Sequence, residues 1–327
     1  MPVLSIVVPV FNEAQSIGVF LERVSPVIAN LKLACEVIFV DDGSTDGTSD
    51  VIANASCTSM SIRLVRLSRN FGKEAALTAG LEASSGDAVI PMDVDLQDPP
   101  ELIAEFVRLW QSGYEVVYGQ RICRNSDSAA KRSSAGLFYW LFNRVSSLSI
   151  EPNVGDFRLM SRAATDATLQ LRERNRFMKG IFAWVGFPAV GVPYVRPSRS
   201  IGNTKFNYWK LWNFALDGLT SFSTAPLRIW TYVGGAVTCG ALLYVAFIIL
   251  QTLIFGREVP GYASLMVVVL LLGAVQLVSL GIIGEYLGRL YMEAKQRPIY
   301  LVRDRIGFES EVSMAAEEAA VAPGVAS

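Results

Sequence analysis

Two long stretches without a charged residue constrain the fold of this 327-residue chain most strongly. They cover residues 229–255 and 262–284, and each exceeds the roughly 20 apolar residues that cross the hydrocarbon core of a bilayer. The alternative is a pair of helices buried in a soluble core, where charge-free runs of this length are rare. The sequence therefore predicts a hairpin of two transmembrane helices.

Lysine and arginine are distributed unequally around this hairpin. Five precede it within residues 196–228 and five follow it within residues 289–305, whereas the connector holds only Arg257, beside Glu258. Because positive residues concentrate on the cytoplasmic side of membrane proteins, both termini are expected in the cytoplasm. The chain is thus predicted to be a multi-pass protein of the inner, cytoplasmic membrane.

The composition excludes several function classes. The chain has no histidine, which excludes Ser-His-Asp and Cys-His catalysis and zinc bound by histidine. A net charge of -1 argues against a nucleic-acid partner. Any acid–base or metal chemistry therefore falls on carboxylates, amides, lysine, tyrosine or a substrate phosphate.

The part before the hairpin alternates short β-branched runs with stretches of helical spacing. Strands are predicted at residues 4–9, 36–41, 62–67, 88–92 and 115–118, and helices at 14–29, 48–54, 73–83 and 99–111. This rhythm predicts the α/β class, with a Rossmann-like, mostly parallel sheet covered by helices on both faces. In such sheets ligands bind at the carboxyl ends of the strands.

Polar or acidic clusters follow four of these strands. They lie at residues 9–13, 41–47, 68–73 and 93–98. A single cluster is explained equally well by turn chemistry, since Asp, Gly, Ser and Asn dominate turns. Four clusters at one edge of a parallel sheet predict a ligand site.

The last of these clusters suggests a metal site. If Asp93 and Asp95 continue an extended segment, their side chains point to the same side, and the amide oxygen of Gln97 follows one step later. Such oxygen ligands suit Mg²⁺ or Mn²⁺, which commonly bind one or two carboxylates together with substrate phosphates. The position after a buried strand favours this interpretation over a chance surface loop. The ion would stabilise a departing diphosphate.

Taken together, these motifs resemble family 2 glycosyltransferases of the A-type fold. More narrowly, the chain resembles bacterial polyprenyl-phosphate glycosyltransferases, relatives of dolichyl-phosphate mannose synthase. The matching segments are residues 8–13, 41–48, 69–74, 93–100, 155–159 and 202–206, with a hairpin that ends at 284–289. The resemblance covers nearly the whole chain except its C-terminal end.

The resemblance implies inverting transfer of a hexose from a nucleotide sugar to a polyprenyl phosphate. We expect UDP-glucose and undecaprenyl phosphate, with UDP-galactose, UDP-N-acetylhexosamine and GDP-mannose as alternative donors. By the same resemblance the donor nucleotide is held by Pro9, Asn12, Glu13, Asp42 and Asp93, with Lys73 near the nucleobase end. The metal ligands are Asp95 and Gln97, together with Asp93.

Asp156 is the base that the resemblance suggests. An acceptor phosphate monoester has a second pKa near 6 and is largely dianionic at pH 7, so it needs little deprotonation. Orientation of the acceptor is therefore an equal interpretation for Asp156. The structural alternative is an ion pair with Arg158.

Two anionic substrates require cations. Arg121, Arg124, Lys131 and Arg132 follow the fifth strand and precede the apolar run 137–142, which suits a segment that grips the lipid phosphate at the membrane. The alternative for this segment is a solvated loop followed by a core helix. Among these cations, Arg121 is the preferred ligand of the lipid phosphate. Lys205, with Arg196 or Arg199, is expected at the diphosphate or the acceptor phosphate; the alternative for Lys205 is a charge attracted to anionic lipid.

These inferences divide the chain into four parts. They are a catalytic domain (1–195), a juxtamembrane segment with an amphipathic interfacial helix at 207–222 (196–228), the transmembrane hairpin (229–291) and a cytoplasmic tail (292–327). Small residues in the hairpin would allow helix contacts in a homo-oligomer. A processive polysaccharide synthase fits poorly, because the chain lacks a Gln-x-x-Arg-Trp motif and further spans. A non-catalytic membrane adaptor that senses nucleotide sugar is the alternative from another class.

Overall fold

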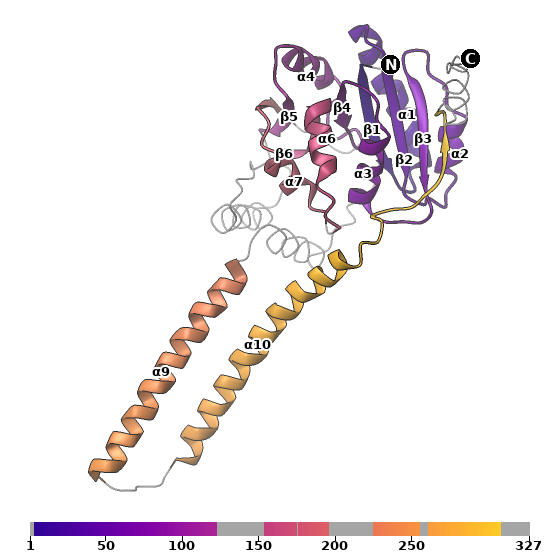
Figure 1. The fold of residues 1–327 in the computed structure, drawn as a ribbon. Helices are drawn as coiled ribbons and strands as arrows, with labels where there is room; N and C mark the ends of the chain where they lie inside the picture. Colours follow the sequence, from indigo (N-terminus) through magenta and orange to yellow (C-terminus); the bar gives the residue numbers. More distant parts are fainter. Residues whose placement is uncertain (1–2, 123–153, 175, 196–224, 256–260, 309–327) are drawn as a thin grey trace, which may run out of the picture.

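The fold is known from a computed structural model that describes residues 3–122, 154–174, 176–195, 225–255 and 261–308 (Figure 1). Its centre is an eight-stranded sheet in the order β7-β5-β6-β4-β1-β2-β3-β8. The strands are β1 (Leu4–Val10), β2 (Cys35–Asp41), β3 (Ser61–Leu67), β4 (Ala88–Pro91), β5 (Val116–Arg121), β6 (Val154–Ser161), β7 (Ala189–Tyr194) and β8 (Val302–Ile306). Strands β4, β1, β2 and β3 run parallel to one another, as do β5 and β7, whereas β6 and β8 are antiparallel to their neighbours.

Helices cover both faces of the sheet, which confirms the predicted α/β class. The helices packed around the sheet are α1 (Ala14–Leu31), α2 (Thr48–Ala53), α3 (Lys73–Ala83), α4 (Leu102–Gln111), α6 (Arg162–Gln170) and α7 (Met178–Trp184). Alternate residues of β1 face opposite sides. Ile6 and Val8 pack in the cluster that contains Phe20 of α1 and Phe106 of α4, whereas Val7 packs with Leu77 of α3.

The C-terminal hairpin consists of α9 (Ala225–Phe255) and α10 (Tyr262–Ala294), which project away from the sheet (Figure 1). Two segments are long and apolar enough to cross a membrane, Tyr232–Gln251 and Leu271–Ala294, and 0% of each is buried inside the protein. Core helices of a soluble domain would be buried, so that alternative does not fit. On α10, Arg289 pairs with Glu285 at 2.8 Å, one helical turn away, as expected for this spacing.

The end of α10 and the chain after it return to the sheet and its helices. The backbone N–H of Arg174 donates to Oε1 of Glu293 at 2.7 Å, and the Tyr300 hydroxyl donates to Glu82 of α3. Strand β8 then pairs with β3 at the edge of the sheet. The sequence predicts a tail here, because the charged residues of Val302–Ile306 give no local signal of a strand; such charges are common on edge strands. The expected interfacial helix at 207–222 lies outside the described residues.

Candidate active site

The loops that follow β1, β2 and β3 are hydrogen-bonded to one another. Oδ1 of Asn12 accepts from the backbone N–H of Thr45 at 2.8 Å. The carboxylate of Asp42 accepts from the backbone N–H groups of Phe71 at 2.7 Å and Gly72 at 2.8 Å. A Cβ on Gly43, whose φ is +75°, would lie 2.6 Å from the backbone carbon of Arg69, so only glycine permits this approach. The expected donor-binding residues therefore share one strand-end surface, with Pro9 at the end of β1 and Glu13 just after it.

Lys73 lies at the centre of the site, between two carboxylates. Its Nζ is 2.7 Å from Oδ1 of Asp93 and 2.9 Å from Oδ2 of Asp156. Strand β6 explains this arrangement, because it pairs antiparallel with β4, Ala88 with Ser161 and Val89 with Met160, so its first half, which holds Asp156, lies toward the end of β4 that leads to Asp93. Lys73 was expected near the nucleobase end of the donor; in the structure it lies between the end of β4 and β6.

The charges of this cluster shift the pKa values of its members. Burial would raise the pKa of the Asp156 carboxyl, but the neighbouring cations, with Lys73 the strongest, lower it to about 2. Burial would likewise lower the pKa of Lys73, but Asp156 and Asp93 raise it. Burial, and then the charge of Asp156, raise the pKa of Glu74 to about 8. At neutral pH Asp156 is therefore an anion paired with the ammonium group of Lys73.

The loop after β4 is a turn and not the expected extended segment. The strand ends at Pro91, residues 94–95 form a turn, and Leu96 has a φ of 53°. Asp93 and Asp95 are partly exposed, Gln97 is buried, and Oδ1 of Asp95 accepts from the backbone N–H of Gln97 at 3.2 Å. The expected alternation of side chains along a strand is therefore wrong here, because the chain turns before Asp95.

The oxygen ligands that this loop offers nevertheless suit a hard divalent cation. Two partly exposed carboxylates and one amide offer oxygen atoms only, which Mg²⁺ and Mn²⁺ prefer. Within the described parts of the chain, no three Asp, Glu, Cys or His side chains come close enough to hold a metal ion. An ion bound here would thus complete its coordination with the Gln97 amide, water or donor phosphates.

Arg121, the preferred ligand for the acceptor phosphate, lies at the end of β5. Its Nε donates to the Tyr194 hydroxyl at 3.0 Å, and its Nη2 is 3.5 Å from Oδ1 of Asp98. Only 23% of its side chain is exposed. Asp98 belongs to the predicted cluster 93–98, whereas Tyr194 was not predicted, because the pairing of β7 with β5 has no local signal in the sequence. The other expected cations lie outside the described residues: Arg124, Lys131, Arg132, Arg196, Arg199 and Lys205.

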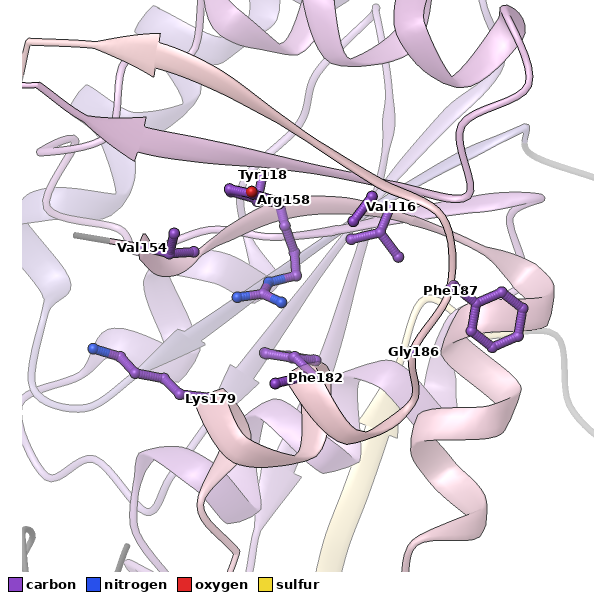
Figure 2. A pocket seen from close by; sticks show the side chains of 10 residues that line it. Val116, Tyr118, Val154, Arg158, Lys179, Phe182, Gly186 and Phe187 are labelled. Atoms are coloured by element: carbon purple, nitrogen blue, oxygen red, sulfur yellow. The ribbon is translucent and has the colours of Figure 1, made fainter. Parts of the chain in front are cut away.

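A cavity of about 300 Å³ opens between β5, β6 and α7 (Figure 2). Arg158 reaches into this space from β6, while α7 contributes Lys179 and Phe182. The guanidinium of Arg158 lies 3.9 Å from the centre of the Phe182 ring, and its Nη2 donates to the carbonyl of Gly155 at 2.9 Å. Arg158 stands two residues after Asp156 on the same strand, so both side chains lie on one face of the sheet. Arg158 and Lys179 therefore help to keep Asp156 ionised.

Comparison with known proteins agrees with this architecture. The model of the family "Glycosyl transferase family 2" matches residues 5–169, and that of the "GtrB C-terminal hairpin" matches residues 225–290. An uncharacterized glycosyltransferase of Synechocystis sp. is 51% identical over 94% of this chain and 96% of its own length. The bactoprenol glucosyl transferase of Shigella phage SfV is 49% identical, and a prophage bactoprenol glucosyl transferase homolog of Escherichia coli K12 is 48% identical; each alignment covers 92% of this chain and 98% of the relative. The chain therefore belongs to glycosyl transferase family 2.

Proposed function

We propose that this protein transfers glucose from UDP-glucose to the phosphate of undecaprenyl phosphate, which yields a polyprenyl-phosphate glucose and UDP. The observation that carries the proposal is the likeness to bactoprenol glucosyl transferases, at 48–49% identity over 92% of the chain. That likeness includes the apolar hairpin, so it extends to the part of the chain suited to reach a lipid acceptor. The strand-end site supplies the ionic groups that such a transfer needs.

The donor lies across the carboxyl ends of β1 to β4. The nucleobase and ribose contact the loops that hold Pro9, Asn12, Glu13 and Asp42. The diphosphate lies toward the turn after β4, where Asp93, Asp95 and Gln97 would hold Mg²⁺ or Mn²⁺. When bound, such an ion neutralises the charge that develops on the departing diphosphate. Lys73 provides a further positive charge beside Asp93.

The acceptor phosphate attacks the anomeric carbon of the sugar. A bond forms between a phosphate oxygen and that carbon, and the bond from the carbon to the diphosphate oxygen breaks, with inversion. The phosphate is largely dianionic at pH 7 and needs no strong base. With a pKa of about 2, Asp156 stays ionised, so it positions Lys73 and stabilises the positive charge that develops at the anomeric carbon. Arg121 binds the acceptor phosphate, together with Arg124, Lys131, Arg132, Arg199 and Lys205.

The hairpin holds the site at the membrane. Helices α9 and α10 cross the bilayer, and the catalytic domain and both termini lie in the cytoplasm. Two observations support this: the lysine and arginine residues concentrate on the domain side of the hairpin, and two of the relatives named above are called bactoprenol glucosyl transferases. Strand β8, which follows α10 after the short connection 295–301 and pairs with β3, keeps the domain close to the membrane surface.

The proposal is tested with membranes that contain the full chain. Incubation with labelled UDP-glucose, undecaprenyl phosphate and Mn²⁺ is expected to give a labelled product soluble in chloroform. Asp95→Ala is expected to lower its formation at least about 100-fold, because one metal ligand is lost. Asp166→Ala is the matched control, since Asp166 is an exposed residue of α6.

Three outcomes would contradict parts of this proposal. Undiminished product with Asp95→Ala would overturn the site. Product from UDP-galactose, UDP-N-acetylhexosamine or GDP-mannose, but not from UDP-glucose, would overturn the donor. Binding of a nucleotide sugar without any turnover would favour a sensing adaptor.

A further inference from the structure

Arg121 is held by two buried side chains that come from other elements. The Tyr194 hydroxyl, at the end of β7, donates to Oδ1 of Asp98 and accepts from Nε of Arg121 at 3.0 Å. Tyr194 is 6% exposed and Asp98 is 4% exposed. A single hydroxyl thus connects the last residue of β5 to the loop that follows β4.

The sheet builds this arrangement. Strands β5 and β7 pair in parallel with Arg121 opposite Tyr194. Gly155 also lies against the guanidinium, since an added Cβ there would be 2.8 Å from Nη2 of Arg121. The guanidinium therefore lies against the backbone immediately before Asp156. Tyrosine, aspartate and glycine together fix its position next to the proposed reaction centre.

The hydroxyl also separates Arg121 from Asp98. Nη2 of Arg121 is 3.5 Å from Oδ1 of Asp98, which is longer than the 2.7–2.9 Å of a strong ion pair. Burial, and then the charge of Asp98, raise the pKa of Tyr194 to about 12, so the hydroxyl keeps its proton and donates a hydrogen bond to the carboxylate. Its lone pair is then directed to Arg121. Without the hydroxyl, Arg121 would lose its fixed partner and could turn onto the Asp98 carboxylate.

We propose that Tyr194 is a positioning residue that holds Arg121 where its guanidinium meets the acceptor phosphate. This inference rests on the proposed function, in which Arg121 binds that phosphate. Because Asp98 belongs to the same loop as Asp95, the hydroxyl fixes Arg121 relative to the donor end of the site. Tyr194 acts through Arg121 and touches neither substrate.

The test compares Tyr194→Phe with a matched variant, Tyr300→Phe. The Tyr300 hydroxyl also donates to a carboxylate, that of Glu82, but away from the site. In the full-length purified enzyme, Tyr194→Phe is expected to raise the KM for undecaprenyl phosphate about tenfold, as suits the loss of one hydrogen bond to a charged group. The KM for UDP-glucose should change less than about twofold, and Tyr300→Phe should leave both values unchanged. A merely structural role would lower the melting temperature without this selective rise.

A double-mutant cycle shows whether the effect passes through Arg121. Arg121→Lys keeps the positive charge but cannot reproduce the fixed planar geometry of the guanidinium. If Tyr194 acts through Arg121, adding Tyr194→Phe to Arg121→Lys should raise the acceptor KM no further. If the buried Asp98 charge prevents Tyr194→Phe from folding, Tyr194→Phe with Asp98→Asn removes that charge and should show the same rise.

The results that would overturn the inference differ from those that would overturn the function. An active wild-type enzyme with an unchanged acceptor KM in Tyr194→Phe contradicts the positioning role alone. Fully multiplicative effects of the two substitutions also contradict it, because they would show independent action. A wild-type protein that forms no lipid-linked glucose contradicts the proposed function and the inference with it.

Discussion

Replacing Asp156 with asparagine is expected to lower the rate of glucosyl transfer without moving the acidic limb of its pH profile. The reason is the environment of this carboxylate. Lys73 Nζ is 2.9 Å from Asp156 Oδ2, and the surrounding cations lower the pKa of Asp156 to about 2. A group that remains ionised over the whole working range cannot produce a limb near neutral pH.

The free energy of proton transfer decides whether Asp156 acts as a general base or as a fixed charge that positions Lys73. The second pKa of a phosphate monoester is near 6, about 4 units above the value of about 2 for Asp156. At 1.36 kcal/mol per unit, moving a proton from the acceptor to Asp156 is uphill by roughly 5 kcal/mol. An acidic limb near pH 6 therefore reports the loss of the second proton from the acceptor phosphate. The loss of the Asp156 charge, which leaves Lys73 and the anomeric carbon less stabilised, is expected to lower the rate about 100-fold, as for other fixed electrostatic groups.

The assay measures initial rates of lipid-linked glucose formation from pH 5 to 9 at saturating UDP-glucose. Wild type and Asp156→Asn should share a limb near pH 6, with Asp166→Asn as a surface control. An acceptor analogue with a more acidic phosphate should move that limb to lower pH in both proteins. If the limb is present in wild type and absent from Asp156→Asn, Asp156 is the titrating base and the reasoning is refuted.

Two further predictions concern the ion pairs of Lys73 and the orientation of the chain in the membrane. Lys73→Met should destabilise the protein by about 2 kcal/mol at pH 7, since it removes two charge-assisted hydrogen bonds that are weakened by solvent at a side chain 45% exposed. The pKa of Asp156 is lowered in the folded state, so this stability is present above about pH 4 and is lost as the pH falls toward 2. The melting temperatures of wild type and Lys73→Met should converge below pH 4, whereas Lys73→Arg stays close to wild type; equal melting temperatures at pH 7 would disprove the pairing. The membrane topology is tested in a cysteine-free chain with an impermeant maleimide. Glu258→Cys should react in intact spheroplasts, whereas Asp166→Cys should react only after lysis. The reverse pattern would contradict the proposed orientation.

The parallel half of the sheet was predictable because its signals are local. Strands at 4–9 and 62–67 are expected from β-branched runs, and the structure has Leu4–Val10 and Ser61–Leu67. The carboxyl ends of parallel strands meet at one edge, so the loops after them had to lie together. The hydrogen bonds from the loop after β3 to Asp42 are a consequence of that topology.

The other half of the site depends on pairings between distant segments. Nothing near Asp156 in the sequence indicates that β6 enters the sheet antiparallel to β4, yet that register brings Asp156 to Lys73. The same is true of Tyr194, which meets Arg121 only because β7 pairs with β5. The turn at residues 94–95 was missed for a different reason: an alternating acidic pattern fits a strand and a turn equally well.

The cations of the site are held by carboxylates that come from other elements of the fold. Lys73 begins α3 and pairs with Asp93 after β4 and Asp156 on β6, and Arg121 is connected to Asp98 through Tyr194. These pairings fix the positive charges before any substrate arrives, so little reorganisation is needed when two anionic substrates meet. They also connect the loops to one another, so a substitution that breaks one pair alters charge and geometry together. A conservative change of the neutral member, Tyr194, separates these two effects, because it leaves every formal charge of the site in place.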